Sequence, residues 1–347
     1  MLSRVLSPIL KLSRGAAPAQ SVDEILNAPG RTIGSRLFRS QEFWITVAVL
    51  VLGLVVAQIA PRFGSAGNLS NVLQNSCFIG ILALGMTPII ISGGIDISIG
   101  SLLGLCGVVF GLLLQANLPL SLGIVLTLIL GAALGGLNGF LIAYVRLPPF
   151  IVTLGMLSIG RSAALIISGN QVVYAFGQAE PGLFALGGGK IFGIGNVVFA
   201  LIGCAIILHI LLRKTQWGRY VQAIGGNERA ARLTGIPVKR VKMSVYMFAG
   251  LMAAVTSIFL VGWLGSVTNA LGQGDELRVI ASTVIGGASL AGGYGTAYGA
   301  AIGALLIEVI RNALLLAGVN PLWQGIFVGS CILLAVLLQR FQVKEEE

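Results

Sequence analysis

The sequence carries little charge for its length. Only 10% of its 347 residues are Asp, Glu, Lys or Arg, whereas soluble globular domains carry about 25%. Hydrophobic residues make up 56% of the chain. Because so few charges cannot cover the surface of a water-soluble domain of this size, the composition predicts a protein that is solvated largely by lipid.

Residue types that serve catalysis or metal binding are also scarce. Histidine occurs once, at His209, and the four cysteines lie in apolar contexts without the spacing of metal ligands. The chain contains no nucleotide-binding P-loop, in which Gly, four residues and Gly-Lys precede Ser or Thr. We therefore expect a chain that is not an enzyme, with no catalytic residue, no cofactor and no metal of its own.

Charge is absent from several long runs of the chain. Between Arg62 and Arg146 the only charged side chain is that of Asp96. Because about 20 apolar residues span a bilayer as a helix, these runs predict an all-α polytopic membrane protein with about ten transmembrane helices. The predicted helices lie near residues 44–60, 72–91, 95–115, 120–144, 149–169, 193–212, 243–264, 276–291, 296–317 and 322–339.

Most basic residues flank these predicted helices. The segment 213–242 carries eight Lys and Arg residues and one acid, Glu228, and the positive-inside rule places such a segment in the cytoplasm. The net charge of +10 is therefore interpreted as a topology signal, not as a nucleic-acid-binding surface. We expect a cytoplasmic tail at 1–43, a transmembrane domain at 44–340 that includes the cytoplasmic loop 213–242, and a cytoplasmic tail at 341–347.

Two glycine-rich segments interrupt the helical pattern, one in each half of the chain. The first break covers residues 92–101 and the second break covers residues 286–295. Because transporters are often built from two repeats whose broken helices form the substrate region, we expect two structural repeats and a pathway near these breaks. The candidate residues of the breaks are Gly93, Gly94, Asp96, Ser98, Ser101, Gly286, Gly287 and Ser289.

Asp96 is the most unusual residue of the first break, because an unpaired charge at membrane depth costs at least about 2.5–3.5 kcal/mol. Two interpretations are compatible with each other. The carboxylate can accept N–H groups at the start of a helix over 97–115. It can also form hydrogen bonds with a polar substrate in a pathway.

Further candidates for the pathway wall are polar or aromatic residues in predicted spans. They are Asn138, Thr153, Arg161, Phe150 and Trp263. Arg161 lies within the fifth predicted span, where a bare cation is costly. We expect its guanidinium either to bind backbone carbonyls, or to support the pathway wall, or to meet a carboxylate such as that of Asp96.

The basic loop contains a short helix with sequence signals at both ends. Asn227 is a typical N-cap residue, residues 228–234 favour a helix, and Gly235 followed by Pro237 ends it. The result is a rigid, capped projection into the cytoplasm. It is either a solvated connector or an element that docks on a partner.

Four motifs in this order resemble those of the permease subunits of bacterial ABC sugar importers of the ribose, xylose and arabinose type. The motifs are Gly93 to Ser101, Leu147 to Leu154 with Arg161 beyond it, Gly225 to Ile236, and Gly286 to Gly293. The resemblance extends from about residue 44 to residue 340, so it covers most of the chain.

The resemblance implies a permease of the bacterial inner membrane that carries a pentose, a hexose or a sugar-like molecule. It implies a dimer, either of two copies or with a related permease. The dimer would work with two cytoplasmic ATPase subunits, which bind ATP and Mg, and with a periplasmic sugar-binding protein. The capped helix would be the coupling helix, seated in the ATPase. Its candidate residues are Gly226, Asn227, Glu228, Ala230, Ala231 and Gly235.

Two features depart from the family pattern. The N-terminal extension is long, and Arg278 stands where family members often have an acidic residue. We expect Arg278 to pair with Asp275 or Glu276, which precede it closely.

A second charged pair lies further along the chain. Glu308 and Arg311 are three residues apart on one predicted helix face, so we expect them to neutralise each other. The alternative function for the whole chain is a stand-alone, ion-coupled secondary transporter or channel, with Asp96 as the ion or proton site.

Overall fold

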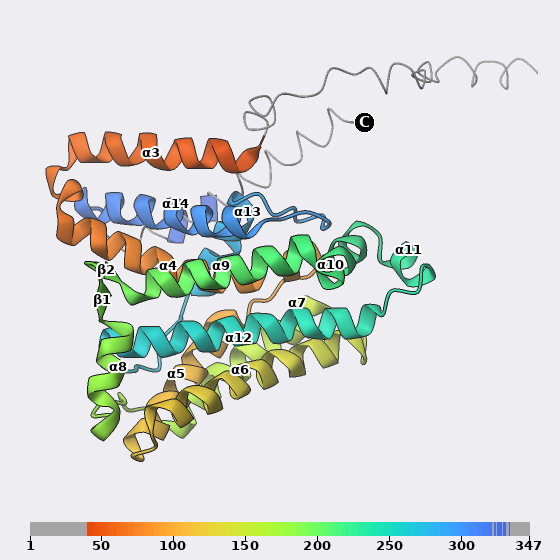
Figure 1. The fold of residues 1–347 in the computed structure, drawn as a ribbon, viewed down its shortest axis with the longest axis horizontal. Coiled ribbons are helices and arrows are strands. Elements are labelled where there is room, and N and C mark those ends of the chain that lie inside the picture. The colour runs from red at the N-terminus through yellow and green to blue at the C-terminus, as the bar shows by residue number, and fades with distance from the viewer. Residues whose placement is uncertain (1–39, 321–322, 324, 328, 331–332, 334–347) are drawn as a thin grey trace, which may run out of the picture. The chain divides into compact units, whose positions relative to one another are not determined.

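The computed structural model describes residues 40–320 without a gap, and then residues 323, 325–327, 329–330 and 333. The predicted N-terminal tail up to residue 39, the C-terminal tail 341–347 and most of the predicted span 322–339 lie outside the described residues. The unit considered below begins at Gln41. It is mostly helical (Figure 1), and together with its long apolar helices this supports the all-α polytopic class.

Seven helices in the described part of the chain are long and apolar enough to cross a membrane. They are α3 (Gln41–Ile59), α4 (Ala66–Ile91), α6 (Leu120–Ala143), α7 (Pro149–Ile167), α9 (Asn196–Lys214), α12 (Val238–Leu264) and α14 (Ala297–Leu316). An eighth apolar helix, α5 (Ile99–Gln115), has 17 residues and is shorter than these.

The remaining elements are short. They are η2 (Pro61–Gly64), η3 (Gly177–Ala179), α8 (Glu180–Gly187), α10 (Gln216–Gly226), α11 (Glu228–Leu233) and α13 (Asp275–Ile285). A small antiparallel hairpin pairs β1 (Lys190–Ile191) with β2 (Ile194–Gly195), with Lys190 opposite Gly195.

The predicted helix over 276–291 is wrong as a continuous span. The α13 helix has 11 residues, which at 1.5 Å per residue make about 16 Å, roughly half of the hydrocarbon core. It ends at Ile285 because Gly286 and Gly287 follow, and Gly287 adopts a left-handed φ of +98°. The next helix begins only at Ala297.

Helix α4 occupies the centre of the fold. In an apolar stretch of 18 residues of α4, 94% is buried inside the protein. The corresponding share is 17% for α3 and for α9. Contacts link α3 to α14, α14 to α4, α4 to α12 and α12 to α6, and Figure 1 shows these long helices side by side with similar axis directions. The outer helices therefore present most of their apolar surface to lipid, while α4 positions the first break inside the protein.

Helices α6 and α12 approach each other through glycines. A Cβ atom placed on Gly131 would overlap the carbonyl oxygen of Gly250, and one on Gly135 would overlap the carbonyl oxygen of Tyr246. By contrast, a Cβ on Gly136 would meet only Met247 Cγ, at 3.9 Å. Small residues of this kind let membrane helices pack backbone to backbone. This close contact brings Tyr246 of α12 next to the first break.

Candidate functional site

Asp96 is fully buried between α4 and α5. Its Oδ1 atom accepts hydrogen bonds from the Ser98 backbone N–H at 2.8 Å and from the Ser98 hydroxyl at 2.6 Å. The helix that follows begins at Ile99, two residues later than expected, and its N-cap residue is Ser98. Asp96 therefore fixes the turn that leads into α5, and it accepts one backbone N–H group, that of Ser98.

The turn around Asp96 is held by neighbouring helices. The Asn138 side chain on α6 donates a hydrogen bond from Nδ2 to Ser98 Oγ at 2.9 Å. The Ser101 hydroxyl donates to the Ser98 carbonyl at 2.8 Å and lies 3.4 Å from the Met156 carbonyl of α7. The first break is thus connected to both α6 and α7 through buried polar side chains.

Tyr246 completes this buried polar cluster. A Cβ atom on Gly94 would lie 2.6 Å from the Tyr246 hydroxyl. Within the described residues, Asp96 Oδ2, Asn138 Oδ1 and Tyr246 Oη have no hydrogen-bond partner. Tyr246 was not predicted from the sequence, because a tyrosine in an apolar helix does not indicate which residue its hydroxyl will face.

The other wall candidates are not gathered around Asp96. Arg161 donates from Nη1 to the carbonyls of Asn269 at 3.0 Å and Leu271 at 2.7 Å. The expectation that it binds carbonyls is confirmed. Among the described contacts none pairs it with Asp96, and the carboxylates that act on it electrostatically are those of Glu276 and Asp275. Thr153 is buried and donates to the Pro149 carbonyl of its own helix at 2.9 Å.

The two aromatic candidates for the pathway wall, Trp263 and Phe150, make their described contacts elsewhere than at Asp96. Trp263 packs on Phe78, with 5.5 Å between the ring centroids. Phe150, at the start of α7, is 58% exposed. Neither ring has a described contact with the buried cluster.

The second break meets the end of α4, directly before the first break, through the backbone. Gly293 in the second break donates its N–H to the carbonyl of Ile91, the last residue of α4, at 2.8 Å. Within the second break, the Ser289 N–H donates to the Tyr294 carbonyl at 3.0 Å. Two segments that are about 200 residues apart in the chain therefore form one structural unit.

The basic loop packs directly against this unit. A Cβ atom on Gly225, near the end of α10, would overlap the carbonyl oxygen of Ile91 and would lie 2.5 Å from the Gly293 nitrogen. Gly225 also contacts Gly292, where a Cβ would lie 2.6 Å from the Gly225 oxygen. We call the backbone contact of Ile91, Gly225 and Gly292–Gly293 the glycine junction.

Helix α11 follows the junction immediately. Asn227 caps it, because its Oδ1 atom accepts the Ala230 N–H at 3.0 Å. Gly235, with a φ of +84°, ends it, and the Ile236 N–H returns to the Ala231 carbonyl at 3.2 Å. Both predicted end signals are confirmed. They define α11 as a short helix of 6 residues.

One ion pair fixes α11 against the start of α12, and a second lies within α11. The Glu228 carboxylate pairs with the Lys242 ammonium at 2.6 Å and with the Arg232 guanidinium at 2.7 Å. The hydrogen bond from Lys242 lowers the pKa of the Glu228 carboxyl below its ordinary value. The buried Ala231 faces inward, whereas Leu233 is 89% exposed. Glu228, Arg229, Arg232 and Leu233 line a cavity of about 620 Å³ on this projecting surface.

A separate charged network connects α13 with α14. Arg278 pairs with Asp275 at 2.7 Å and with the buried Glu308 at 3.1 Å. Arg311 donates from Nε to Glu308 at 2.9 Å. The expected pairs Arg278–Asp275 and Glu308–Arg311 are confirmed, and the structure joins them into one network through the additional contact of Arg278 with Glu308.

These features define a polytopic helical membrane protein in which two broken segments meet beneath an exposed, capped helix. The chain belongs to the family described as branched-chain amino acid transport system / permease component, whose model matches residues 68–336. The matched region contains both breaks, Asn138 and α11.

Similar curated proteins are transport permeases. A ribose import permease of Escherichia coli (strain K12) is 38% identical over 293 residues, which cover 84% of this chain and 91% of that protein. A fructose import permease of Rhizobium meliloti is 33% identical and covers 94% of this chain and 96% of its own length. A probable ABC transporter permease of Sinorhizobium fredii is 36% identical over 86% of this chain and 89% of its own length. No solved structure matches the chain.

Proposed function

We propose that this chain is the membrane subunit of an ABC importer that carries a monosaccharide or a sugar-like molecule. A periplasmic binding protein would deliver the sugar, and a separate ATPase that binds ATP and Mg would drive its passage. The family description refers to branched-chain amino acids. Relatives that align over most of the chain are named for ribose and fructose, and this near full-length similarity favours a sugar.

The glycine junction is the observation that carries the mechanism. Gly225 precedes α11 by three residues and contacts both Ile91 and Gly293. A rigid displacement of α10 and α11 would therefore move the second break and the end of α4 that leads into the first break, because backbone atoms in contact leave no side chain to absorb it. Packed elements of this kind switch between discrete arrangements. ATP-driven closure of the ATPase would in this way reach the pathway.

Helix α11 has the properties of a docking element. Its caps and the Glu228–Arg232 pair stabilise the helix, and the Glu228–Lys242 pair holds it in one orientation against α12. Its outer surface presents the exposed Leu233 beside Arg229 and Arg232. An apolar anchor surrounded by cations would suit a groove with an apolar floor and acidic walls.

The membrane topology follows from the same assignment. The basic segment 213–242 faces the cytoplasm, and both termini lie on that side. Ten membrane segments would comprise the seven long helices, α5, the half-length α13 and the span over 322–339. Two permeases, identical or related, would enclose the pathway between them.

The buried cluster shapes the pathway rather than coupling an ion. Asp96 is fully buried and its Oδ1 atom is used by the Ser98 turn. We assign it first to the geometry of the break, and direct contact with sugar hydroxyls comes second. A neutral sugar needs hydroxyl and amide partners, and the buried Ser98, Ser101 and Asn138 would supply them when transport exposes this cluster.

Reversing the Glu228 charge tests the coupling role. In proteoliposomes that contain the ATPase and the binding protein, Glu228→Lys should reduce ATP-driven sugar uptake at least about tenfold, because it removes the anchor of α11 and places three cations together. The charge swap that combines Glu228→Lys with Lys242→Glu restores an opposite-charge pair and should recover part of the uptake. Full uptake by the assembled Glu228→Lys single variant would refute the coupling role of α11.

A further inference from the structure

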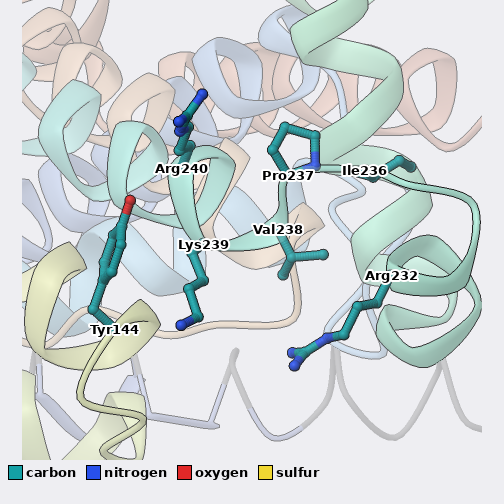
Figure 2. Close-up of a pocket in the computed structure, with 7 residues that line it drawn as sticks. All are labelled: Tyr144, Arg232, Ile236, Pro237, Val238, Lys239 and Arg240. Carbon is teal, nitrogen blue, oxygen red and sulfur yellow. The ribbon is translucent and has the colours of Figure 1, made fainter.

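A second cavity, of about 440 Å³, lies between the end of α6 and the connection from α11 to α12. Figure 2 shows the residues that line it, which come from the turn after α6, from α11, from the connection that follows α11 and from the start of α12. They are Tyr144, Arg232, Ile236, Pro237, Val238, Lys239 and Arg240. We call this cavity the basic pocket.

The lining of the basic pocket is positively charged. Three of its lining residues are cationic, and none of those that the structure describes is acidic. Lys239 Nζ lies 5.5 Å above the centroid of the Tyr144 ring. Among the described ion pairs none involves Lys239, whereas Arg232 uses one Nη2 contact for Glu228. A guanidinium has five N–H donors, so Arg232 keeps others for a ligand.

The three cations are not equivalent. In Figure 2 the Lys239 ammonium and the Arg232 guanidinium extend to the same side of the pocket, on either side of Val238. The Arg240 guanidinium extends to the opposite side. We call Lys239 and Arg232, which line the pocket and extend to the same side in this view, the Lys239–Arg232 clamp, and Arg240 is not part of it.

The pocket lies beside the C-terminal end of α6 and the N-terminal end of α12, both of which are long apolar helices. Tyr144 directly follows the last residue of α6, and its ring stacks on Phe140 at 5.4 Å. Half-exposed aromatic rings at helix ends are typical of the membrane interface. Towards the membrane from the pocket, Leu137 and Phe140 on α6 and Met247 on α12 are exposed apolar side chains.

We propose that the basic pocket binds the phosphate headgroup of an anionic phospholipid. The Lys239–Arg232 clamp would hold the phosphate, Tyr144 would cover the glycerol region, and the acyl chains would lie on the exposed apolar surface of α6 and α12. Basic pockets at the cytoplasmic ends of membrane helices bind such headgroups. An acidic protein side chain would satisfy the clamp but would leave the adjoining apolar surface without a partner. The lipid would also connect α11, through Arg232, to the membrane end of α6.

Lipid binding to the purified permease tests this site without any transport measurement. The protein is exchanged into phosphatidylcholine nanodiscs, and its affinity for phosphatidylglycerol is measured by native mass spectrometry at near-physiological salt. Wild-type protein should bind phosphatidylglycerol in preference to added phosphatidylcholine. Lys239→Gln should weaken this binding about fivefold, the effect of one cation at a membrane surface.

Arg240→Gln is the matched control, because it removes the same charge one residue away from the clamp. It should change phosphatidylglycerol affinity by less than about twofold, and thermal unfolding should show that both variants are folded. Equal losses in the two variants would overturn the pocket in favour of diffuse surface charge. Unchanged lipid affinity in Lys239→Gln, combined with weaker ATPase binding, would overturn it in favour of a protein contact. Inorganic phosphate that competes as well as phosphatidylglycerol would overturn the lipid as the source of the anion.

Discussion

At the residue scale, Asp96 illustrates how a buried charge is used. Its carboxylate organises Ser98, which in turn is held by Asn138. A local cap or turn was foreseeable from the position of Asp96 before an apolar helix. The position of Asn138 and Tyr246 close to Asp96 was not foreseeable, because both residues belong to other helices.

Substituting Asp96 separates geometry from charge. Asp96→Asn should keep at least about half of the sugar uptake, because the Asn Oδ1 atom can accept the same Ser98 N–H and O–H groups. Asp96→Ala should lower the free energy of unfolding by about 1–3 kcal/mol, because the Ser98 N–H is left unpaired. Uptake assays and thermal unfolding in detergent measure the two effects. Complete loss of uptake in a well-folded Asp96→Asn protein would show that the charge itself is required.

Glu228 gives a pH dependence with a definite sign. Because the folded-state pKa lies below its ordinary value, the ion pairs stabilise the fold above about pH 4.3, and this stabilisation is lost as the pH falls through the lower, folded-state pKa. The side chain is 39% exposed, so solvent screening limits the effect to about 1 kcal/mol or less.

The comparison of wild type with Glu228→Gln isolates this contribution. The wild type should have the higher melting temperature at pH 7, and the difference should vanish below the pKa of the folded carboxyl. Melting curves recorded from pH 7 down to pH 3 measure it. A difference that grows on acidification would contradict the lowered pKa.

At the element scale, close helix packing depends on which glycine faces the neighbour. Gly135→Ala should destabilise the protein by about 1–3 kcal/mol, because the new methyl group overlaps the Tyr246 carbonyl and forces α6 away from α12. Gly136→Ala should stay within about 0.5 kcal/mol of wild type, because its methyl group makes only an ordinary contact. Chemical unfolding of both variants is the measurement, and equal stability of the two would refute the packing argument.

The glycine junction permits a similar comparison on function. A methyl group in Gly225→Ala collides with the Ile91 carbonyl, so sugar uptake should fall at least about fivefold as α10 is displaced from the breaks. Gly203→Ala on α9 adds a methyl group to open space and should transport normally. Uptake in cells, corrected for permease abundance in the membrane, compares them. Equal uptake would mean that the junction does not transmit movement.

At the scale of the whole molecule, the proposed importer and a stand-alone transporter make opposite predictions. Proteoliposomes with this permease alone should show no sugar uptake under a proton or sodium gradient. Uptake should require the ATPase, ATP and the binding protein together. Gradient-driven uptake by the permease alone, abolished by Asp96→Asn, would instead support Asp96 as an ion site.

The sequence by itself determined the membrane class, most helix positions and the ends of α11. These depend on local quantities, namely the length of apolar runs and the residue types that satisfy the N–H and C=O groups at helix ends. It overestimated the length of α13, because the predicted span was extended through the first residues of the predicted break at 286–295, where Gly287 adopts a left-handed backbone conformation.

Only the tertiary structure decided which distant segments meet. The contact of Ile91 with Gly225 and Gly293 is made by backbone atoms, and glycines that permit such an approach resemble glycines that face lipid. The Arg161 guanidinium binds the carbonyls of Asn269 and Leu271 rather than Asp96. This partner depends on the path of the chain after α12, which passes along α5. The physical reason is common to both cases: a residue's type limits the bonds it can make, while the packing of other helices selects its neighbour.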